Sequence, residues 1–263
     1  LVLMGSAHAQ LMQQKLVPFD GDPNDQFGLR VAHVPGWAFV GANFDDDVQF
    51  QSGAVYVYQS IGDAWTFTQK LKEPVPGFSD QFGNTVAASG DWMVAGAWKA
   101  APGGISSAGA VQVYQHLNGT WVHHQELVAS DFDSGLTKNF GEYVAIDGAV
   151  MVVGMPRDSF KTVQSGSVYV FELQGATWVE TAKLAPASPQ DWEFGSFFGG
   201  AVDVSGNTLV VGAPFLDTDI SDSNRGAAFV FERIGSSWVQ TQRLVSSDLG
   251  VGDVFGVSVA MSG

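Results

Sequence analysis

Hydrophobic and polar positions alternate along this chain in short runs that return in the same order. One such run, residues 198–214, reads Phe-Gly-Gly-Ala-Val-Asp-Val-Ser-Gly-Asn-Thr-Leu-Val-Val-Gly-Ala-Pro. Its Phe-Gly pair recurs at intervals of 55 to 58 residues, at Phe27, Phe82, Phe140, Phe198 and Phe255. A Gly stands fourteen positions after each of the first four, at Gly41, Gly96, Gly154 and Gly212. A fixed offset within a nearly fixed period indicates one supersecondary unit copied in tandem.

Each copy predicts four short strands. In the third copy, strand one covers residues 142–146 and strand two covers residues 150–154, with a tight turn at Gly148-Ala149 between them. The other predicted ranges are 54–58, 110–114, 167–171 and 227–231 for strand three, and 65–71, 121–127, 178–184 and 238–244 for strand four. β-branched and aromatic residues alternate with others in these runs, and no segment sustains a helical period of about 3.6 residues. The chain is therefore predicted to be all-β.

Four antiparallel strands in a unit of this length match one blade of a β-propeller, in which sheets stack around a common axis. The recurring Phe, Trp and strand-three aromatic residues are expected to pack between blades. We predict four complete blades, at 27–81, 82–139, 140–197 and 198–254, and a partial fifth copy at 255–263. Residues 10–26 are interpreted as the outer strand of a closing blade, at 13–16, followed by a linker. The chain is expected to form an open arc of a larger ring.

Composition and charge limit the classes of partner. The chain has 263 residues, of which 45% are hydrophobic and 12% aromatic, and this excludes a disordered protein. The net charge is -15, and the twelve Lys and Arg residues are scattered singly, so that no basic stripe exists for nucleic acid or an anionic membrane. There is no Cys, which rules out disulfides, zinc thiolate sites and a Cys nucleophile. No apolar run approaches the roughly 20 residues that a membrane-spanning helix needs, and no membrane insertion is expected.

The first nine residues carry a pattern typical of export. Residues 1–4 are apolar, Gly5 and Ser6 are small, and Ala7-His8-Ala9 fits the A-x-A rule for signal-peptide cleavage. We interpret residues 1–9 as the remnant of a signal peptide, and an inner strand of a blade is the alternative. The predicted location is therefore secreted or at the cell surface.

At this point the motifs resemble a known family. Phe-Gly followed by Val-Val-Gly-Ala-Pro resembles the FG-GAP repeat, and residues 16–263 are similar to the propeller of integrin α subunits. The likeness is closer to the FG-GAP repeats of secreted microbial proteins. The matching pieces include Val31-Ala32, Val86-Ala87, Val144-Ala145, Val259-Ala260, Gly212-Ala213-Pro214 and Lys70-Leu71. The resemblance implies a β-propeller, with seven blades if it follows the integrins, that acts as a binding or adhesion module.

One feature of the integrin repeats is missing. Those repeats carry a calcium loop of the Asp-x-Asp-x-Asp-Gly type between strands one and two, which a hard cation needs for its oxygen ligands. Here the same interval is only a turn such as residues 89–92. The resemblance therefore does not extend to the integrin calcium site, and no cofactor is expected. Asp217, Asp219 and Asp222 are the remaining metal candidates, for calcium, although their spacing matches no named loop.

The candidate ligand site lies on loops. The connections from strand two to strand three and from strand four to the next copy are long, and in a propeller both classes emerge on one face, where binding residues concentrate. Their chemistry is acidic with interspersed aromatic residues, which suit a cation or a sugar ring. The ligand-face candidates are Phe44, Asp45, Asp46, Asp47, Trp98, Asp131, Asp133 and Phe215. The alternative is that Asp serves here as a turn former and solubiliser.

Catalysis has little support in the sequence. The five His residues show no metal-ligand spacing, and no nucleophile elbow, P-loop or H-E-x-x-H motif occurs. We therefore expect an exported, non-catalytic binding or adhesion module for an extracellular protein or glycan, with further domains in the full-length chain. Two alternatives stay open: an accessory or catalytic domain of a secreted polysaccharide-active enzyme, in which carboxylates from distant loops meet, and a purely structural scaffold.

Overall fold

In the four complete copies the strands form where the repeats predict them. The computed structural model of the chain describes residues 14–131, 138–217, 224–248 and 250–262. In these ranges the strands form four antiparallel sheets. The first sheet holds β1 (Val31–Val34), β2 (Trp37–Ala42), β3 (Ala54–Ile61) and β4 (Ala64–Leu71), and the second holds β5 (Thr85–Ser89), β6 (Trp92–Ala97), β7 (Ala110–Leu117) and β8 (Thr120–Leu127). The third holds β9 (Tyr143–Asp147), β10 (Val150–Met155), β11 (Ser167–Gln174) and β12 (Thr177–Leu184), and the fourth holds β13 (Ala201–Ser205), β14 (Thr208–Ala213), β15 (Ala227–Ile234) and β16 (Ser237–Leu244).

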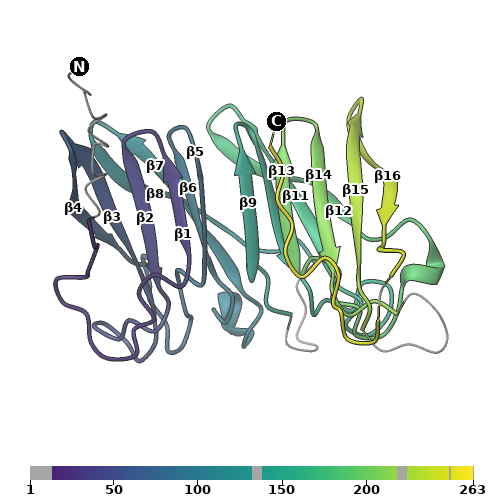
Figure 1. The fold of residues 1–263 in the computed structure, drawn as a ribbon. Coiled ribbons are helices and arrows are strands. Elements are labelled where there is room, and N and C mark those ends of the chain that lie inside the picture. The colour runs from purple at the N-terminus through teal and green to yellow at the C-terminus, as the bar shows by residue number, and fades with distance from the viewer. Residues whose placement is uncertain (1–13, 132–137, 218–223, 249, 263) are drawn as a thin grey trace, which may run out of the picture.

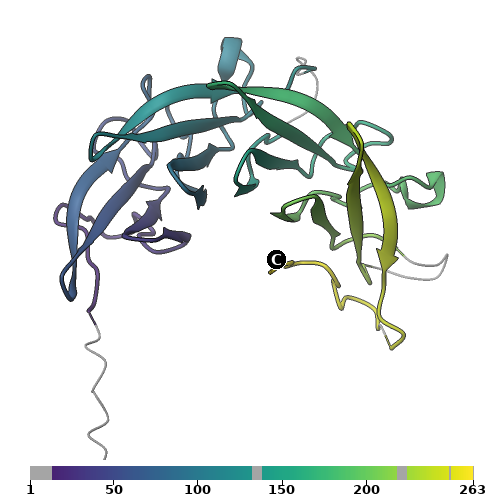
Figure 2. The ribbon, with the colours of Figure 1, turned by 90° about the horizontal axis from the view of Figure 1, so that it is seen from above.

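The four sheets are consecutive blades of a β-propeller. Figure 1 shows them standing side by side, and within each sheet the strands follow one another in sequence order. Figure 2 shows the sheets along an open arc, with β1, β5, β9 and β13 toward its inside. The predicted all-β propeller of four complete blades is therefore confirmed, and we number the blades one to four along the chain.

Strands three and four are longer than predicted because only two residues connect them. β11 continues to Gln174, and Gln174 pairs with Thr177 at the start of β12. Gly175, between them, has a φ of 65°, the left-handed conformation that a two-residue hairpin turn requires. Pairing therefore runs up to the turn itself.

Helices are few in the described ranges. They are two short 3-10 turns, η1 (Pro102–Gly104) and η2 (Pro189–Asp191), and both lie in long loops. Neither is long and apolar enough to cross a bilayer, and the same holds for the whole described part of the chain.

The hydrophobic core lies between the blades. One cluster joins Val168 and Val170 of the third blade to Phe198, Phe229 and Trp238 of the fourth. Equivalent clusters join the first blade to the second and the second to the third. The side chains of the Phe-Gly residues Phe82, Phe140 and Phe198 have no exposed surface. The prediction that the recurring aromatic residues pack between blades is confirmed.

The Gly of strand two contacts the next blade through backbone. At Gly154 a Cβ atom would lie 2.3 Å from the carbonyl oxygen of Gly199, which belongs to the Phe-Gly pair of the following copy. The distances at the equivalent positions are 2.2 Å from Gly41 to Gly83, 2.0 Å from Gly96 to Gly141 and 1.9 Å from Gly212 to Gly256. No side chain fits in this gap. The fixed offset between Phe-Gly and the later Gly therefore reflects the close approach of successive blades.

A glutamine on strand four clasps the next blade. The side chain of Gln125 accepts a hydrogen bond from the backbone N–H of Trp178 at 2.9 Å and donates one to the Trp178 carbonyl at 2.9 Å. Gln69 makes the same two bonds to Trp121, and Gln14 makes them to Trp65. The clasp fixes the start of strand four against the preceding blade.

Replacing Gln125 by alanine tests the clasp. Two backbone groups of Trp178 lose their partners, and we expect the free energy of unfolding to fall by about 1–2 kcal/mol. Urea denaturation measures the change. The matched control is Gln242→Ala, at the equivalent position of the fourth blade, where the side chain is exposed and the effect should stay within about 0.5 kcal/mol. Equal effects of the two substitutions would contradict the clasp.

The partial copies form no strand in the described residues 14–26 and 250–262. Gln14 takes the place of Gln69 and Gln125 against the first blade, but the predicted strand at 13–16 has no strand beside it with which to pair. Phe255 makes one isolated bridge to Gly226. Residues 1–9 lie outside the described ranges, and the signal peptide stays a prediction.

Candidate functional site

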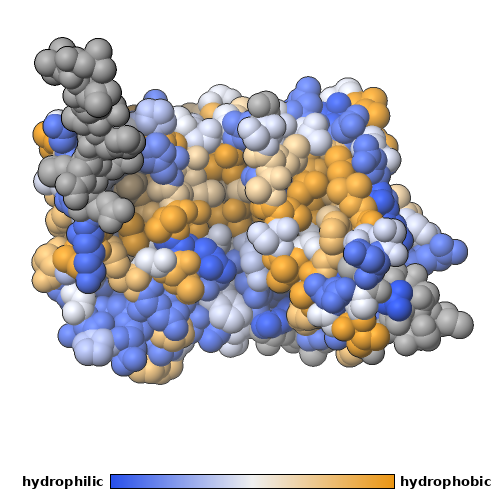
Figure 3. Space-filling view, in the orientation of Figure 1, coloured by the Kyte–Doolittle hydropathy of each residue, from blue (hydrophilic) through white to orange (hydrophobic). Residues whose placement is uncertain are grey.

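The two classes of long loop lie on one face of the arc. Gly166, at the end of the β10–β11 loop, bridges to Phe198, at the end of the β12–β13 loop. The same bridge joins Gly53 to Phe82. Figure 1 shows these loops along the lower edge of the molecule. In the same view, Figure 3 shows hydrophilic residues gathered at the lower left edge below a hydrophobic band. We call this surface the long-loop face.

An ion-pair cluster ties the loops of the third blade together. Lys183 Nζ lies 2.6 Å from Asp131 Oδ2 and 2.6 Å from Asp158 Oδ2. The Tyr169 hydroxyl donates to Asp131 at 2.6 Å, and the Ser167 hydroxyl donates to Asp158 at 2.8 Å. Burial raises the pKa of Asp131, but the bonds from Lys183 and Tyr169 outweigh it and hold that pKa below its usual value. Lys183 thus pairs with both carboxylates, of which Asp158 is buried and Asp131 is exposed.

The first blade repeats this cluster with equivalent residues. Lys70 Nζ lies 2.8 Å from Asp20 and 2.6 Å from Asp45, and it also contacts Asp47. The Tyr56 hydroxyl donates to Asp20 at 2.7 Å and to Asp45 at 2.9 Å. Asp45 is only 1% exposed. Of the predicted ligand-face residues, Asp45, Asp47 and Asp131 are therefore engaged by lysines of their own blade.

Other predicted ligand-face residues lie nearer the surface. Phe44 and Asp46 line a small pocket of about 170 Å³ together with Asp25 and Phe50. Burial, the largest influence, raises the pKa of Asp25, and the carboxylates of Asp45 and Asp46 act in the same direction.

Trp98 and Phe215 lie in the β6–β7 and β14–β15 loops. The Trp98 indole N–H donates to the side chain of Gln81 at 2.9 Å. Phe215 is 38% exposed and packs edge-on against Phe197, with ring centroids 5.3 Å apart. Asp133 lies outside the described residues, and its place on the long-loop face stays a prediction.

The metal candidates are only partly described. Asp217 Oδ1 accepts a hydrogen bond from the backbone N–H of Asn224 at 2.7 Å, so this carboxylate closes its own loop. Asp219 and Asp222 lie outside the described residues. Within those residues, no group of three His, Cys, Asp or Glu side chains is placed to hold a metal ion.

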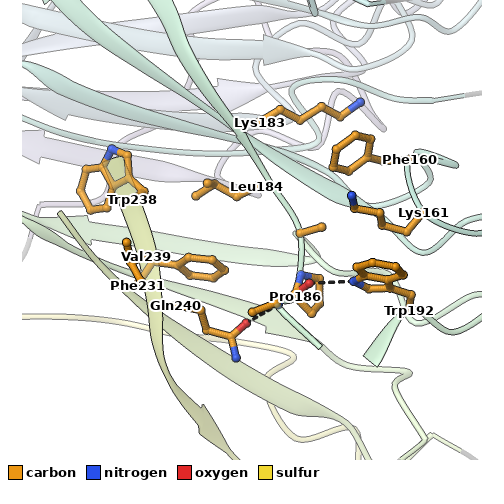
Figure 4. Close-up of a pocket in the computed structure, with 12 residues that line it drawn as sticks. Phe160, Lys161, Lys183, Leu184, Pro186, Trp192, Phe231, Trp238, Val239 and Gln240 are labelled. Atoms are coloured by element: carbon orange, nitrogen blue, oxygen red, sulfur yellow. Dashed lines mark hydrogen bonds between the residues drawn. The ribbon is translucent and has the colours of Figure 1, made fainter. Parts of the chain in front are cut away.

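A pocket of about 400 Å³ opens between the third and fourth blades. Figure 4 shows Phe160, Lys161 and Trp192 on the loop side, and Trp238 and Val239 of the fourth blade on the other side. Phe160 belongs to the β10–β11 loop and Trp192 to the β12–β13 loop, so both long-loop classes contribute. We call it the aromatic pocket.

The rings of the aromatic pocket are held in place. The Trp192 indole N–H donates to the carbonyl of Pro186 at 2.7 Å, a bond drawn in Figure 4. Lys161 Nζ lies 4.3 Å from the centroid of the Phe160 ring and 4.8 Å from that of Trp192. A cation over an aromatic face is attracted to the ring's π electrons. The pocket is therefore lined by two aromatic rings and by two lysines, Lys161 and Lys183, whose ammonium groups both lie over Phe160.

The sequence analysis missed the aromatic pocket. Trp192 lies in a long loop, and it is not the Trp that recurs at the start of strand four in every copy. Phe160 likewise occupies a position at which the other copies have no recurring aromatic residue. A large aromatic residue that does not recur cannot be explained by packing between repeated blades, and this signal could have identified both residues.

The repeats match the FG-GAP repeat family over residues 11–58, 65–114, 121–171, 178–231 and 238–263. Four of these matches begin at the Trp of strand four, so the family unit spans the last strand of one blade and the first three of the next. No curated protein matches the chain.

Among solved structures, the chain is similar to a candidate 6-phosphogluconolactonase from Bacteroides uniformis, with a TM-score of 0.54 and 8% identity over 84% of this chain. The chain spans 57% of the length of that structure, and at this identity the likeness shows the fold alone. Each of the five family matches contains one of the recurring Phe-Gly pairs at 27, 82, 140, 198 and 255, and together the matches cover most of the sequence. The chain belongs to the FG-GAP repeat family.

Proposed function

We propose that this chain is an exported, non-catalytic propeller module that binds a glycan in the aromatic pocket, at the cell surface or after secretion. The C–H face of a sugar ring packs on an aromatic ring, and ligand pockets combine such rings with a few polar groups. The observation that carries the proposal is the pair of ordered rings, Phe160 and Trp192, in a pocket of about 400 Å³. The Lys161 ammonium adds a donor for sugar oxygens.

Two features support a binding role over catalysis. Lys183, which lines the aromatic pocket, is ion-paired with Asp131 and Asp158, so these two carboxylates are engaged within the protein. The pocket also draws its walls from two blades and has no Asp or Glu side chain among the described residues that line it. A polysaccharide-active enzyme or accessory domain remains the competing function, and an extracellular protein is the competing ligand. Because calcium binding at Asp217 is a separate hypothesis, glycan binding is measured both with and without calcium.

Glycan-array binding tests the proposal. We expect the wild-type chain to bind a defined set of glycans, equally with and without calcium. Trp192→Ala should weaken binding at least tenfold, because it removes the ring surface that is held by Pro186.

The matched control for Trp192→Ala is Trp98→Ala, which removes a loop tryptophan of the same face outside the aromatic pocket. Both variants should keep the thermal unfolding midpoint within a few degrees of the wild type. The role of the aromatic pocket would be contradicted if both variants lost glycan binding equally, or if Trp192→Ala bound glycans as tightly as the wild type. Hydrolysis of a bound glycan would favour the enzyme.

A further inference from the structure

The second blade lacks the cation that the other three blades place on strand four. In each blade one residue of strand three faces the residue that precedes the last Leu of strand four. The facing pairs are Tyr56 with Lys70, Gln112 with Glu126, Tyr169 with Lys183, and Phe229 with Arg243. Glu126 therefore stands where lysine or arginine stands in the others.

The cations of the other blades are bound by loop carboxylates. Lys183 lies 2.6 Å from Asp158, and the guanidinium Nε of Arg243 lies 2.9 Å from Asp191. The second blade keeps acidic loop residues, Glu73 and Asp80, although its strand-four residue is also acidic. The carboxylates of the second blade thus face Glu126 at the position where the first, third and fourth blades provide Lys70, Lys183 or Arg243.

These carboxylates lie close together, and two of them, Glu73 and Asp80, are buried. Gln112 Nε2 donates to Glu73 Oε1 at 3.1 Å and to Glu126 Oε2 at 2.8 Å, so one amide nitrogen holds both. Glu73 and Asp80 are each 6% exposed. Asp80 accepts a hydrogen bond from the backbone N–H of Gly77 at 2.5 Å. Glu73 Oε2 is buried and accepts no hydrogen bond from an amide or hydroxyl donor of the described residues, and the Glu73 carboxyl group lies against that of Asp80.

The carboxylates form one wall of a pocket of about 510 Å³, which we call the acidic pocket. Ala100 lines it at the position that Asp45 and Asp158 occupy in the first and third blades, and this small side chain leaves the space open. The pocket is also lined by apolar residues that are open to solvent, with Val75 86% exposed and Phe78 71% exposed.

We propose that the acidic pocket binds a lysine side chain of a partner protein, whose ammonium takes the place that Lys70 and Lys183 fill in their own blades. The methylene groups of that side chain pack on Val75 and Phe78, while the ammonium pairs with the carboxylates of Glu73 and Asp80. This site is separate from the aromatic pocket and does not depend on glycan binding.

An ammonium suits the acidic pocket better than a metal ion. In the described residues, these side chains do not converge as three ligands of one metal. In the first and third blades, the loops that precede strand one also carry a carboxylate that accepts an Nζ atom, Asp20 at 2.8 Å and Asp131 at 2.6 Å. Lys99 also lines the pocket and could supply a cation from within the chain. In the structure, however, Lys99 Nζ lies over the Trp98 ring, 4.7 Å from its centroid. Lys99 is therefore a competitor that the test must include.

Lysine binding in the acidic pocket should depend on pH, because Glu73 must be deprotonated to pair with an ammonium. Burial, and then the charge of Asp80, raise the pKa of Glu73 to about 8. Burial also raises the pKa of Asp80, and Glu126, His123, Tyr114 and Lys99 are the other titratable groups around the pocket. An ammonium favours the charged carboxylate, so binding releases a proton near neutral pH. The affinity for lysine should rise between pH 6 and pH 8.5, where the ammonium itself stays charged.

The probe for the test is Nα-acetyl-lysine N-methylamide, followed by NMR shifts of the backbone amides of Gly77, Asp80 and Gln112. We expect saturable binding by the wild-type chain, and at least tenfold weaker binding of the same probe with an acetylated Nε. Glu73→Gln should weaken binding at least tenfold. Lys99→Met should bind as tightly as the wild type or more tightly.

A second variant supplies the missing cation within the chain. Glu126→Lys should abolish binding of the probe and raise the thermal unfolding midpoint, since it recreates the arrangement of the first and third blades. The proposal is overturned if the probe does not shift the three amides, if Glu126→Lys binds it as the wild type does, or if calcium chloride shifts the same amides and displaces the probe.

Discussion

Replacing Lys183 by methionine is expected to lower the free energy of unfolding by about 3 kcal/mol, because it leaves a buried carboxylate without its ion-pair partner. Asp158 is 2% exposed and lies 2.6 Å from Lys183 Nζ. Lys138, at 3.6 Å from the other oxygen of Asp158, compensates only in part. Methionine keeps the length of the side chain, so the change isolates the charge. Chemical denaturation at neutral pH measures the effect.

The pH dependence of the Lys183→Met effect tests its electrostatic origin. The pKa of Asp131 is lowered in the folded state, so its contribution is complete above the unfolded pKa of about 4 and is lost as the pH falls through the lower folded pKa. The difference between wild type and variant should therefore narrow below pH 4. Lys161→Met, at an exposed position, is the matched control and should cost less than about 0.5 kcal/mol. A difference that is independent of pH would contradict the ion-pair explanation.

Replacing Gly154 by alanine is expected to cost roughly 3 kcal/mol, because the new Cβ overlaps a backbone atom that cannot move alone. The Cβ would lie 2.3 Å from the carbonyl oxygen of Gly199 in the following blade. To relieve this overlap, the third and fourth blades would have to separate, and Phe198 would then lose part of its packing in the core between them. Thermal and urea unfolding measure the loss.

Gly148→Asn is the matched control for Gly154→Ala. Gly148 lies in the β9–β10 turn with a φ of 55° and with open space around its Cα, and asparagine tolerates this left-handed conformation. The control should change the free energy of unfolding by less than about 1 kcal/mol. A similarly small effect of Gly154→Ala would show that the blades accommodate a methyl group and would refute the contact as the reason for the repeated Gly.

Much of the fold could be predicted because each blade repeats the same local rules. The alternation of β-branched residues predicted a strand at residues 150–154, and the observed strand β10 runs from Val150 to Met155. The Phe-Gly period predicted which segments are equivalent. The close contact of Gly154 with Gly199 could not be predicted, since it depends on how two sheets approach each other and not on either sheet alone.

The candidate sites were harder to predict because they depend on side chains from distant loops. Asp45 resembles a surface carboxylate in the sequence, yet it is buried and paired with Lys70 of β4, and Asp131 is paired with Lys183 of β12. Comparison of the copies position by position would have singled out Glu126, where the other blades carry a cation. The aspartates at 217, 219 and 222 remain a calcium hypothesis.

The contacts between sheets run from each blade to the next one along the chain, from β1 to β5, from β5 to β9 and from β9 to β13. In thermodynamic terms the arc is a series of nearest-neighbour couplings, so its stability is the sum of terms for single blades and for the junctions between them. Damage at the junction of the first two blades and damage at the junction of the last two should therefore be additive, and each blade can change its loop chemistry without altering the stability of a distant one.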